Sequence, residues 1–262
     1  MAIISMAMNR SIYIMIMTVM MFLSSCFVKE DRDGCPCWMT VEMPDRVGHD
    51  GSVVLRLRGN SDEDAVDYTY KISESIKADV GILEYEVPRG SVGVSVVNSA
   101  RLVVPVGEQM DSLYGFFKPY HTRCESVKCD VELHKEFCTV SFTLVDEHYE
   151  SPYDIEVRGN VSGVSPWDLV PVSGAFKYAP VAEEGVYRVR IPRQVDASLE
   201  MVMLCNQEIV SRFPLGEYII KSGYDWSAKD LSDVSVALDL EKQQVMVTVS
   251  GWDGIVVMDV VI

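Results

Sequence analysis

The chain has 262 residues, of which 48% are hydrophobic and 24% charged, and its formal net charge at pH 7 is −16. A surplus of acidic residues this large argues against nucleic acid as a partner, because a face that binds nucleic acid must be basic. The length allows one large or two small domains.

The N-terminal stretch, residues 1–25, contains no acid and a single base. Its apolar run, Ile12–Leu23, has the length of a signal-peptide core and is shorter than the roughly 20 residues that a membrane-spanning helix needs. The run ends in Ser24-Ser25-Cys26, and Leu-Ser-Ser-Cys resembles the lipobox of bacterial lipoproteins. This resemblance implies cleavage between Ser25 and Cys26, a diacylglycerol on the Cys26 sulfur, and an acyl chain such as palmitate on its new amine. The alternative is an ordinary secretory signal that is cleaved near a cysteine.

An acidic stretch, Phe27–Gly34, follows Cys26 and contains three acids. It resembles the export signal that sends some Bacteroidales lipoproteins to the cell surface, and the other interpretation is a solvated linker. We therefore assign residues 26–37 as a lipidated acidic linker. The expected location is the outer membrane, with surface display favoured over the periplasmic face.

From residue 38 onward, apolar residues alternate with polar ones or form short valine-rich runs, and Gly, Pro, Asn and Asp separate these runs. Alternation of this kind predicts strands with one buried face. The predicted strands are Val53–Arg58, Ser91–Val97, Val127–Leu133, Val140–Leu144, Val186–Ile191, Leu199–Leu204, Val234–Leu240, Val245–Val249 and Ile255–Ile262. Short helices are expected only after Pro105 and Pro214.

The strand-forming part of the chain contains an internal repeat. The matching pairs, in order, are Arg58-Gly59-Asn60 with Arg158-Gly159-Asn160, Pro88-Arg89 with Pro192-Arg193, Asn98 with Asn206, Pro105 with Pro214, and Val127–Phe142 with Val234–Val249. Many short strands without crossover helices predict antiparallel Greek-key β-sandwiches. We expect one sandwich over residues 38–136 and a second over 137–262, which ends in an additional strand without a counterpart in the first copy.

Six cysteines remain besides Cys26: Cys35, Cys37, Cys124, Cys129, Cys138 and Cys205. An even number in an exported chain permits disulfides. A bond within Cys35-Pro36-Cys37 would close a strained ring, so these two are expected to pair elsewhere. His134 gives the segment 124–138 a loose resemblance to a metal site, but structural thiols or a disulfide are favoured over zinc.

Other candidate sites are weak. The acidic run Asp62-Glu63-Asp64 lacks the spacing of a calcium loop and is expected to be a solvated face. Trp167 and Trp226 lie in polar loops, where an exposed aromatic could stack on a sugar and a buried one would anchor the loop. No catalytic motif, metal site or cofactor motif is recognised, so the sequence predicts a protein that is not an enzyme.

The lipobox, the Cys-Pro that follows it, the two β-modules and the closing motifs Gly216-Glu217-Tyr218-Ile219 and Val247–Trp252 resemble the FimB-type minor fimbrial subunits of Bacteroidales. The resemblance covers nearly the whole chain. It implies two transthyretin-like domains, no catalysis, and attachment of a fimbrial shaft to the outer membrane with control of its length. It also implies assembly with shaft subunits by donation of a β-strand.

Two other functions remain open on the sequence alone. A surface lipoprotein that binds glycan would share the anchor, the acidity and the fold class. A lipoprotein enzyme would require a cluster of catalytic side chains that the sequence does not provide.

Overall fold

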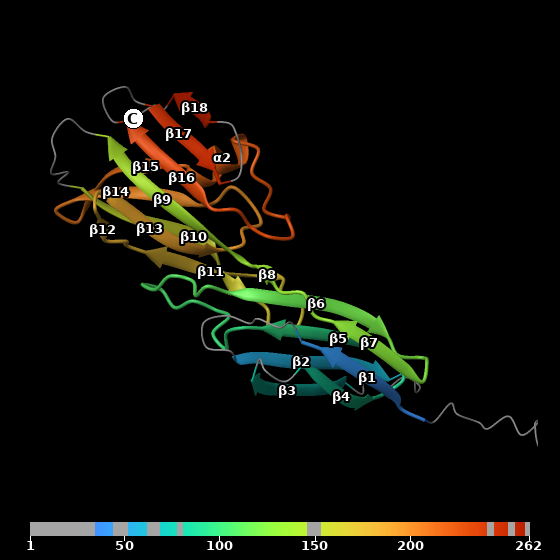
Figure 1. Ribbon diagram of the computed structural model, residues 1–262. Helices are drawn as coiled ribbons and strands as arrows, with labels where there is room; N and C mark the ends of the chain where they lie inside the picture. Colours follow the sequence, from blue (N-terminus) through green and yellow to red (C-terminus); the bar gives the residue numbers. More distant parts are fainter. Residues whose placement is uncertain are drawn as a thin grey trace, which may run out of the picture. The chain divides into compact units, whose positions relative to one another are not determined.

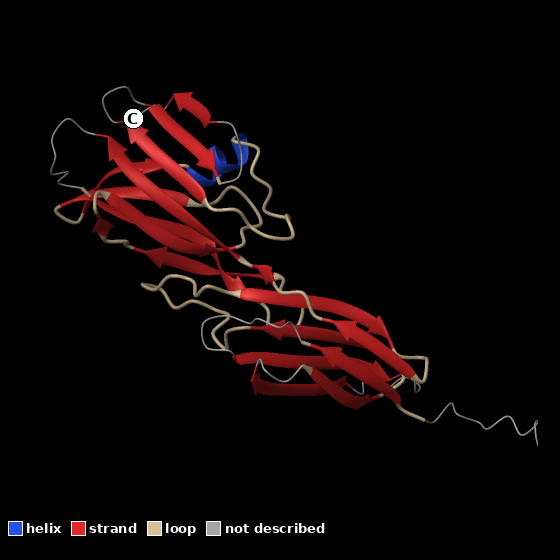
Figure 2. Cartoon of the chain, viewed as in Figure 1, coloured by secondary structure: helices blue, strands red, loops and turns tan. Residues whose placement is uncertain are grey.

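A computed structural model describes residues 35–43, 52–61, 69–77, 81–145, 153–239, 244–250 and 255–259 of the chain (Figure 1). Strands dominate these residues, and α2 (Leu215–Lys221) follows Pro214 as the sequence predicts (Figure 2). The predicted all-β fold class is therefore confirmed. In the described part of the chain, no helix is both long and apolar enough to cross a bilayer.

The first half of the described chain forms two sheets. A five-stranded sheet has the order β3-β2-β5-β6-β8, made of β2 (Ser52–Ser61), β3 (Thr69–Lys77), β5 (Gly90–Val97), β6 (Tyr114–His121) and β8 (His134–Lys135). A three-stranded sheet has the order β4-β1-β7, made of β1 (Cys37–Glu42), β4 (Ile82–Val87) and β7 (Ser126–Asp130). Apolar side chains from both sheets, among them Met39, Leu55 and Val94, form one buried cluster.

The second half also forms two sheets. A four-stranded sheet has the order β11-β10-β14-β15, made of β10 (Asp154–Val164), β11 (Pro171–Tyr178), β14 (Glu200–Cys205) and β15 (Glu208–Phe213). A six-stranded sheet has the order β12-β13-β9-β16-β17-β18, made of β9 (Phe137–Val145), β12 (Ala182–Glu183), β13 (Val186–Pro192), β16 (Val234–Asp239), β17 (Gln244–Val249) and β18 (Ile255–Asp259). Phe142, Phe176 and Met201 belong to the buried cluster of this half.

The sequence repeat corresponds to a repeated topology. β1 pairs antiparallel with β4 and parallel with β7, and β9 pairs in the same senses with β13 and β16. The order β3-β2-β5-β6 in one half likewise matches β11-β10-β14-β15 in the other. Cys37–Ile262 nevertheless form one compact unit, so the division into two domains at residues 136 and 137 stays a prediction.

The connection between the third and fourth strands of the larger repeated sheet differs between the two halves. In the second half, β14 passes to β15 through a tight turn in which Asn206 and Gln207 have φ values of 52° and 68°. In the first half, the long segment 98–113 lies between β5 and β6. Pro105 lies within this segment and precedes only a turn, whereas Pro214 follows β15, so the matched prolines are not structurally equivalent.

The segment 98–113 contributes apolar side chains to the core of the second half. Its buried residues are Leu102, Val104, Met110 and Leu113. The backbone of the segment also bonds to β10, because the Val164 N–H donates to the Leu102 oxygen (2.9 Å) and the Val104 N–H donates to the Ser162 oxygen (2.8 Å). The two halves therefore share core residues.

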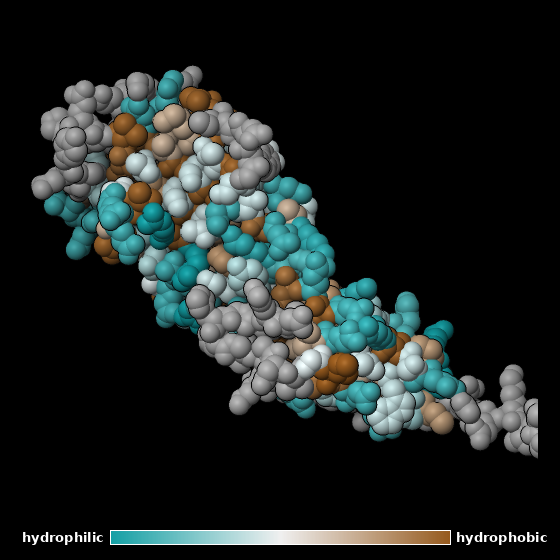
Figure 3. Space-filling view, in the orientation of Figure 1, coloured by the Kyte–Doolittle hydropathy of each residue, from teal (hydrophilic) through white to brown (hydrophobic). Residues whose placement is uncertain are grey.

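The visible surface is mainly hydrophilic. On the face shown in Figure 3, apolar side chains occur as separate patches among polar ones. Val181, at 82% exposure, and Val257, at 54%, are among the exposed apolar residues of the described chain. Scattered exposed apolar side chains are normal for a folded protein and do not by themselves define an interface.

Candidate interaction site

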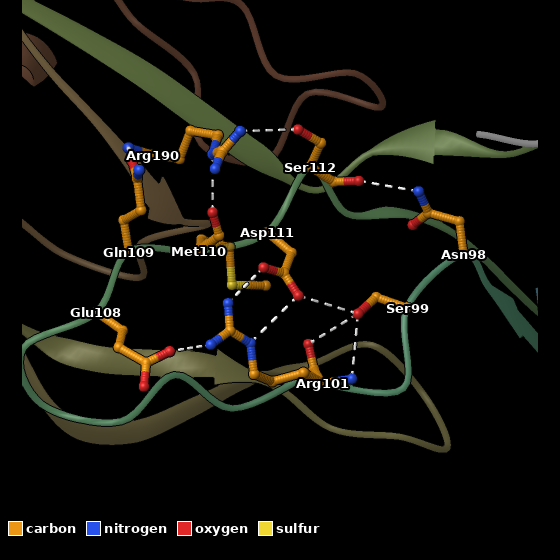
Figure 4. A network of polar contacts seen from close by, with 9 residues as sticks. All are labelled: Asn98, Ser99, Arg101, Glu108, Gln109, Met110, Asp111, Ser112 and Arg190. Atoms are coloured by element: carbon orange, nitrogen blue, oxygen red, sulfur yellow. Dashed lines mark hydrogen bonds and ion pairs between the residues drawn. The ribbon is translucent and has the colours of Figure 1, made fainter. Parts of the chain in front are cut away.

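A polar network holds the segment 98–113 in shape (Figure 4). Arg101 Nε donates to Asp111 Oδ2 (3.2 Å), and the Ser99 hydroxyl donates to the same oxygen (3.2 Å). The guanidinium also pairs with Glu108. The hydrogen bond from Arg101 is the main reason that the pKa of Asp111 lies below its ordinary value. Asp111 is therefore a charged anchor of this segment.

Arg190 on β13 joins the same segment to the six-stranded sheet. Its Nε donates to the Met110 carbonyl oxygen (2.9 Å), and its Nη1 donates to the Ser112 hydroxyl (3.1 Å) (Figure 4). The Met110 N–H donates in turn to the Arg190 carbonyl oxygen (3.0 Å). Backbone and side chain together fix residues 110–112 against β13.

A groove of about 510 Å³ opens beside this junction. Its lining includes Tyr114, which is 37% exposed, and the partly buried Tyr178, together with polar side chains from β9 and β13. The Lys135 ammonium donates to Asp233 Oδ1 (2.6 Å) at its wall. The groove therefore places aromatic rings beside hydrogen-bonding side chains.

The Pro-Arg element of the repeat has the same structural role in both halves. Arg89, which follows β4, donates from Nη1 to the Arg123 carbonyl oxygen (2.6 Å), just before β7. Arg193, which follows β13, donates from Nη1 to the Ala228 carbonyl oxygen (2.8 Å), before β16. In each half this arginine holds the loop that leads into the parallel strand.

The edge of β7 differs from the equivalent edge of β16. In the second half, β17 pairs antiparallel with β16, and β18 pairs with β17. β18 confirms the predicted terminal strand over the residues described there, Ile255–Asp259. In the first half, β7 is the outermost strand of its sheet in the described residues. The described chain thus covers the edge in one half and leaves it open in the other.

The backbone bonds of β7 show which of its groups face outward. The Trp38 N–H donates to the Glu125 oxygen (2.9 Å), and the Val131 N–H donates to the Glu42 oxygen (3.0 Å). In a parallel ladder, alternate residues bond to the same neighbour. The odd-numbered residues of 125–131 therefore bond toward β1.

The N–H groups of Ser126, Lys128 and Asp130 consequently point away from β1. Lys128 pairs on the surface with Glu42 (2.8 Å) and Asp130 (3.0 Å). Charged side chains of this kind protect an exposed edge from indiscriminate pairing. In the described residues, the edge of β7 therefore combines outward backbone N–H groups with charged side chains on the surface.

The predicted lipid site, Cys26, and the preceding cleavage residue, Ser25, lie outside the described residues. The acidic run 62–64 also lies outside them. Trp226 is buried, and its ring contacts that of Tyr224 with 4.6 Å between centroids. It is therefore a loop anchor and not a sugar platform. Trp167 is half-buried between β10 and β11.

The cysteine-rich segment does not converge on one site. Cys129 is buried in the cluster of the first half and Cys138 in that of the second. His134 instead lies 3.1 Å from Asp230. The groove and the contacts of Arg101 and Arg190 were not predicted from the sequence, because they combine residues from distant parts of the chain.

Comparison with known proteins defines the class of fold. No protein-family model and no curated protein sequence matches the chain. Solved structures of Bacteroidales adhesins and fimbrial proteins do match it in fold. The resemblance to fimbrial subunits that the sequence indicates is therefore confirmed at the level of the fold.

Three of these structures are especially informative. A candidate polysaccharide-binding protein from Bacteroides thetaiotaomicron has 13% identity and a TM-score of 0.59, with 86% of this chain and 98% of that one covered. A candidate adhesin from Bacteroides ovatus has 13% identity and a TM-score of 0.59, with 86% and 95% covered. The fimbrial anchor protein Mfa2 from Porphyromonas gingivalis has 8% identity and a TM-score of 0.53, with 83% and 98% covered.

Proposed function

We propose that this chain is a lipid-anchored minor fimbrial subunit without catalytic activity. Cys26 carries the lipid, which holds the protein in the outer membrane at the cell surface. The strand-rich body binds the fimbrial shaft, attaches it to the membrane and limits its length. The lipobox, the shared fold with a fimbrial anchor protein and the open edge of β7 support this proposal.

The open edge of β7 supports the proposal that the protein assembles by addition of a strand. A strand from a neighbouring subunit would lie beside β7, at the position that β17 takes beside β16. Main-chain hydrogen bonds along such a strand would supply affinity, and side chains on one face would supply specificity. Repeated bonds along the length of the strand would also distribute a pulling force.

A backbone substitution at Lys128 tests this assembly mode. Lys128→Pro removes an outward N–H that does not bond to β1, and proline is tolerated at strand edges. Lys128→Ala removes the same side chain and its ion pairs but keeps the N–H. We expect cells with Lys128→Pro to shed fimbriae into the medium, while cells with Lys128→Ala retain them.

Two outcomes of this experiment would contradict the proposal. Equal retention by both variants would show that the outward N–H is not used. Equal shedding would show that the side chain and not the backbone makes the contact. A thermal unfolding curve for each variant checks that the body is still folded.

Glycan binding is the second candidate, and the groove beside Tyr114 and Tyr178 favours it. One structural neighbour carries a polysaccharide-binding name. Tyr114→Ala should then abolish any signal on a glycan array, whereas Tyr85→Ala, on β4 and outside the groove lining, should not. Retention of every signal by Tyr114→Ala would reject this candidate.

A further inference from the structure

Cys37 and Cys124 lie close to the starts of two neighbouring strands, β1 and β7. Cys37 is the first residue of β1 and is 0% exposed. Cys124 precedes β7 and is exposed. Burial is the main reason that the pKa of Cys37 lies above its ordinary value, and the neighbouring Cys124 thiol raises it further.

The parallel pairing of β1 with β7 brings these residues together. Trp38 is the register partner of Ser126, so Cys37 lies opposite Glu125, and Cys124 is offset from Cys37 by one residue. Neighbouring strands run about 4.8 Å apart, and an offset of one residue adds about 3.3 Å along the strand, so the two Cα atoms are expected about 6 Å apart. This separation lies within the range of about 4.4–6.8 Å found between the Cα atoms of a disulfide. The Cys124 thiol also lies 3.2 Å from the carbonyl oxygen of Ser126, the first residue of β7.

The other described cysteines are placed differently. Cys129 and Cys138 are buried in separate clusters, and Cys205 ends β14. Cys35 is exposed two residues before Cys37 and is the competing partner for Cys124. Cys37 is favoured because Cys124 is the neighbouring group that adds most, after burial, to its raised pKa, which places the two thiols side by side.

We propose that Cys37 and Cys124 form a disulfide that fastens the start of β1 to the start of β7. The oxidant is a disulfide, either of a thiol oxidoreductase in the cell envelope or of glutathione. The exposed Cys124 thiolate attacks this disulfide, forms a mixed disulfide and releases one thiol. Cys37 then attacks the Cys124 sulfur and releases the second thiol. Two protein thiols lose two electrons and two protons, and the oxidant disulfide is reduced to two thiols.

The disulfide lies where the chain from the lipid site enters the fold. β1 is hydrogen-bonded to β4 on one side and to β7 on the other, so a pull through the preceding residues acts first on β1. The bond passes part of this load directly to β7. This mechanical role rests on the proposed function, whereas the bond itself does not.

Peptide mapping under non-reducing conditions tests the proposal on the purified full-length chain after incubation with oxidised glutathione. We expect a linked pair of peptides that contains Cys37 and Cys124. Reduction should lower the Tm by about 10 °C, because the bond closes a long loop. A Cys35–Cys124 link, or alkylation of both Cys37 and Cys124 by iodoacetamide in the folded oxidised chain, would overturn the proposal.

Cysteine variants provide the controls. Cys124→Ser alters an exposed side chain, so it should fold and lose the sensitivity of its Tm to reduction. Cys205→Ser should keep the full shift. Equal shifts in the two variants would contradict the proposed pairing. Loss of membrane attachment with the linked peptides intact would count against the fimbrial anchor and not against the disulfide.

Discussion

Arg193 and Glu136 form a buried ion pair, with 2.9 Å between Nε and Oε2 and side chains that are 13% and 11% exposed. Burial raises the pKa of Glu136 above its ordinary value even though Arg193 favours the charged form. The Arg193 guanidinium also donates to the carbonyl oxygens of Trp226 and Ala228. One side chain thus connects β13, the start of β9 and the loop before β16.

Removing this arginine should be strongly destabilising. Arg193→Met leaves the Glu136 carboxylate buried without its partner, which costs about 3–5 kcal/mol of unfolding free energy. Arg212→Met removes the exposed pair with Glu200 (3.0 Å) and should cost at most about 1 kcal/mol. Urea denaturation measures both values, and equal losses would show that the buried pair has no special role.

Asp233 should make part of the stability dependent on pH. Burial opposes its ionisation, but hydrogen bonds from Lys135 and the Thr139 N–H outweigh this and lower its pKa below 3.8. The unfolded chain therefore takes up the proton at a higher pH, and the stabilisation is present above about pH 3.8 and lost as the pH falls through the folded pKa.

The variant Asp233→Asn tests this linkage. It should have a lower Tm than the unaltered protein at neutral pH, and the difference should shrink as the carboxyl is protonated in acid. Melting curves recorded by circular dichroism across the acid range measure the two trends. A difference that stays constant with pH would show that Asp233 acts without its charge.

Two valines in the segment 98–113 form a matched pair. Val104 is 3% exposed and belongs to the core of the second half, whereas Val106 is 60% exposed. Val104→Ala should cost about 2 kcal/mol of unfolding free energy, and Val106→Ala should change it by no more than about 0.5 kcal/mol. If chemical denaturation gave the same midpoint for both variants, the segment would not be part of this core.

Gly163 allows the segment to approach β10. A Cβ added there would lie 2.0 Å from the Leu102 carbonyl oxygen and 2.8 Å from the Val103 Cα, which are backbone atoms. Gly163→Ala should therefore cost about 1–3 kcal/mol, measured by thermal unfolding. Gly81→Ala meets no atom within 4 Å and is the control. An unchanged Tm in Gly163→Ala would indicate that the segment shifts freely.

Sequence periodicity predicted the strands whose two faces differ. β17 alternates between half-buried and buried residues along Gln244–Val249, and the sequence predicts it over Val245–Val249. Edge strands such as β15 (Glu208–Phe213), which has mostly exposed side chains, lack this pattern and were not predicted. The repeat was also recognised from the sequence, because its matching residues follow one another in the same order. In the structure, its Pro-Arg element donates equivalent hydrogen bonds in both copies.

The contacts between distant segments of the chain could not be predicted from the sequence. Glu136 and Arg193 are ordinary charged residues in the sequence, and only the fold shows that they meet in a buried site. The segment 98–113 resembles a surface loop because Pro105 and Gly107 interrupt it. Its apolar residues do not show a period, so their burial against β10 depends on the tertiary fold.

Amide hydrogen exchange across β7 tests the central claim most directly. The outward N–H groups of Ser126, Lys128 and Asp130 should exchange rapidly in the isolated protein and become protected when the protein is part of an assembled fimbrium. The amides of Val127 and Cys129, which bond toward β1, should be protected in both states and serve as the internal reference. Unchanged exchange of the outward amides on assembly would contradict the addition of a neighbouring subunit's strand at this edge.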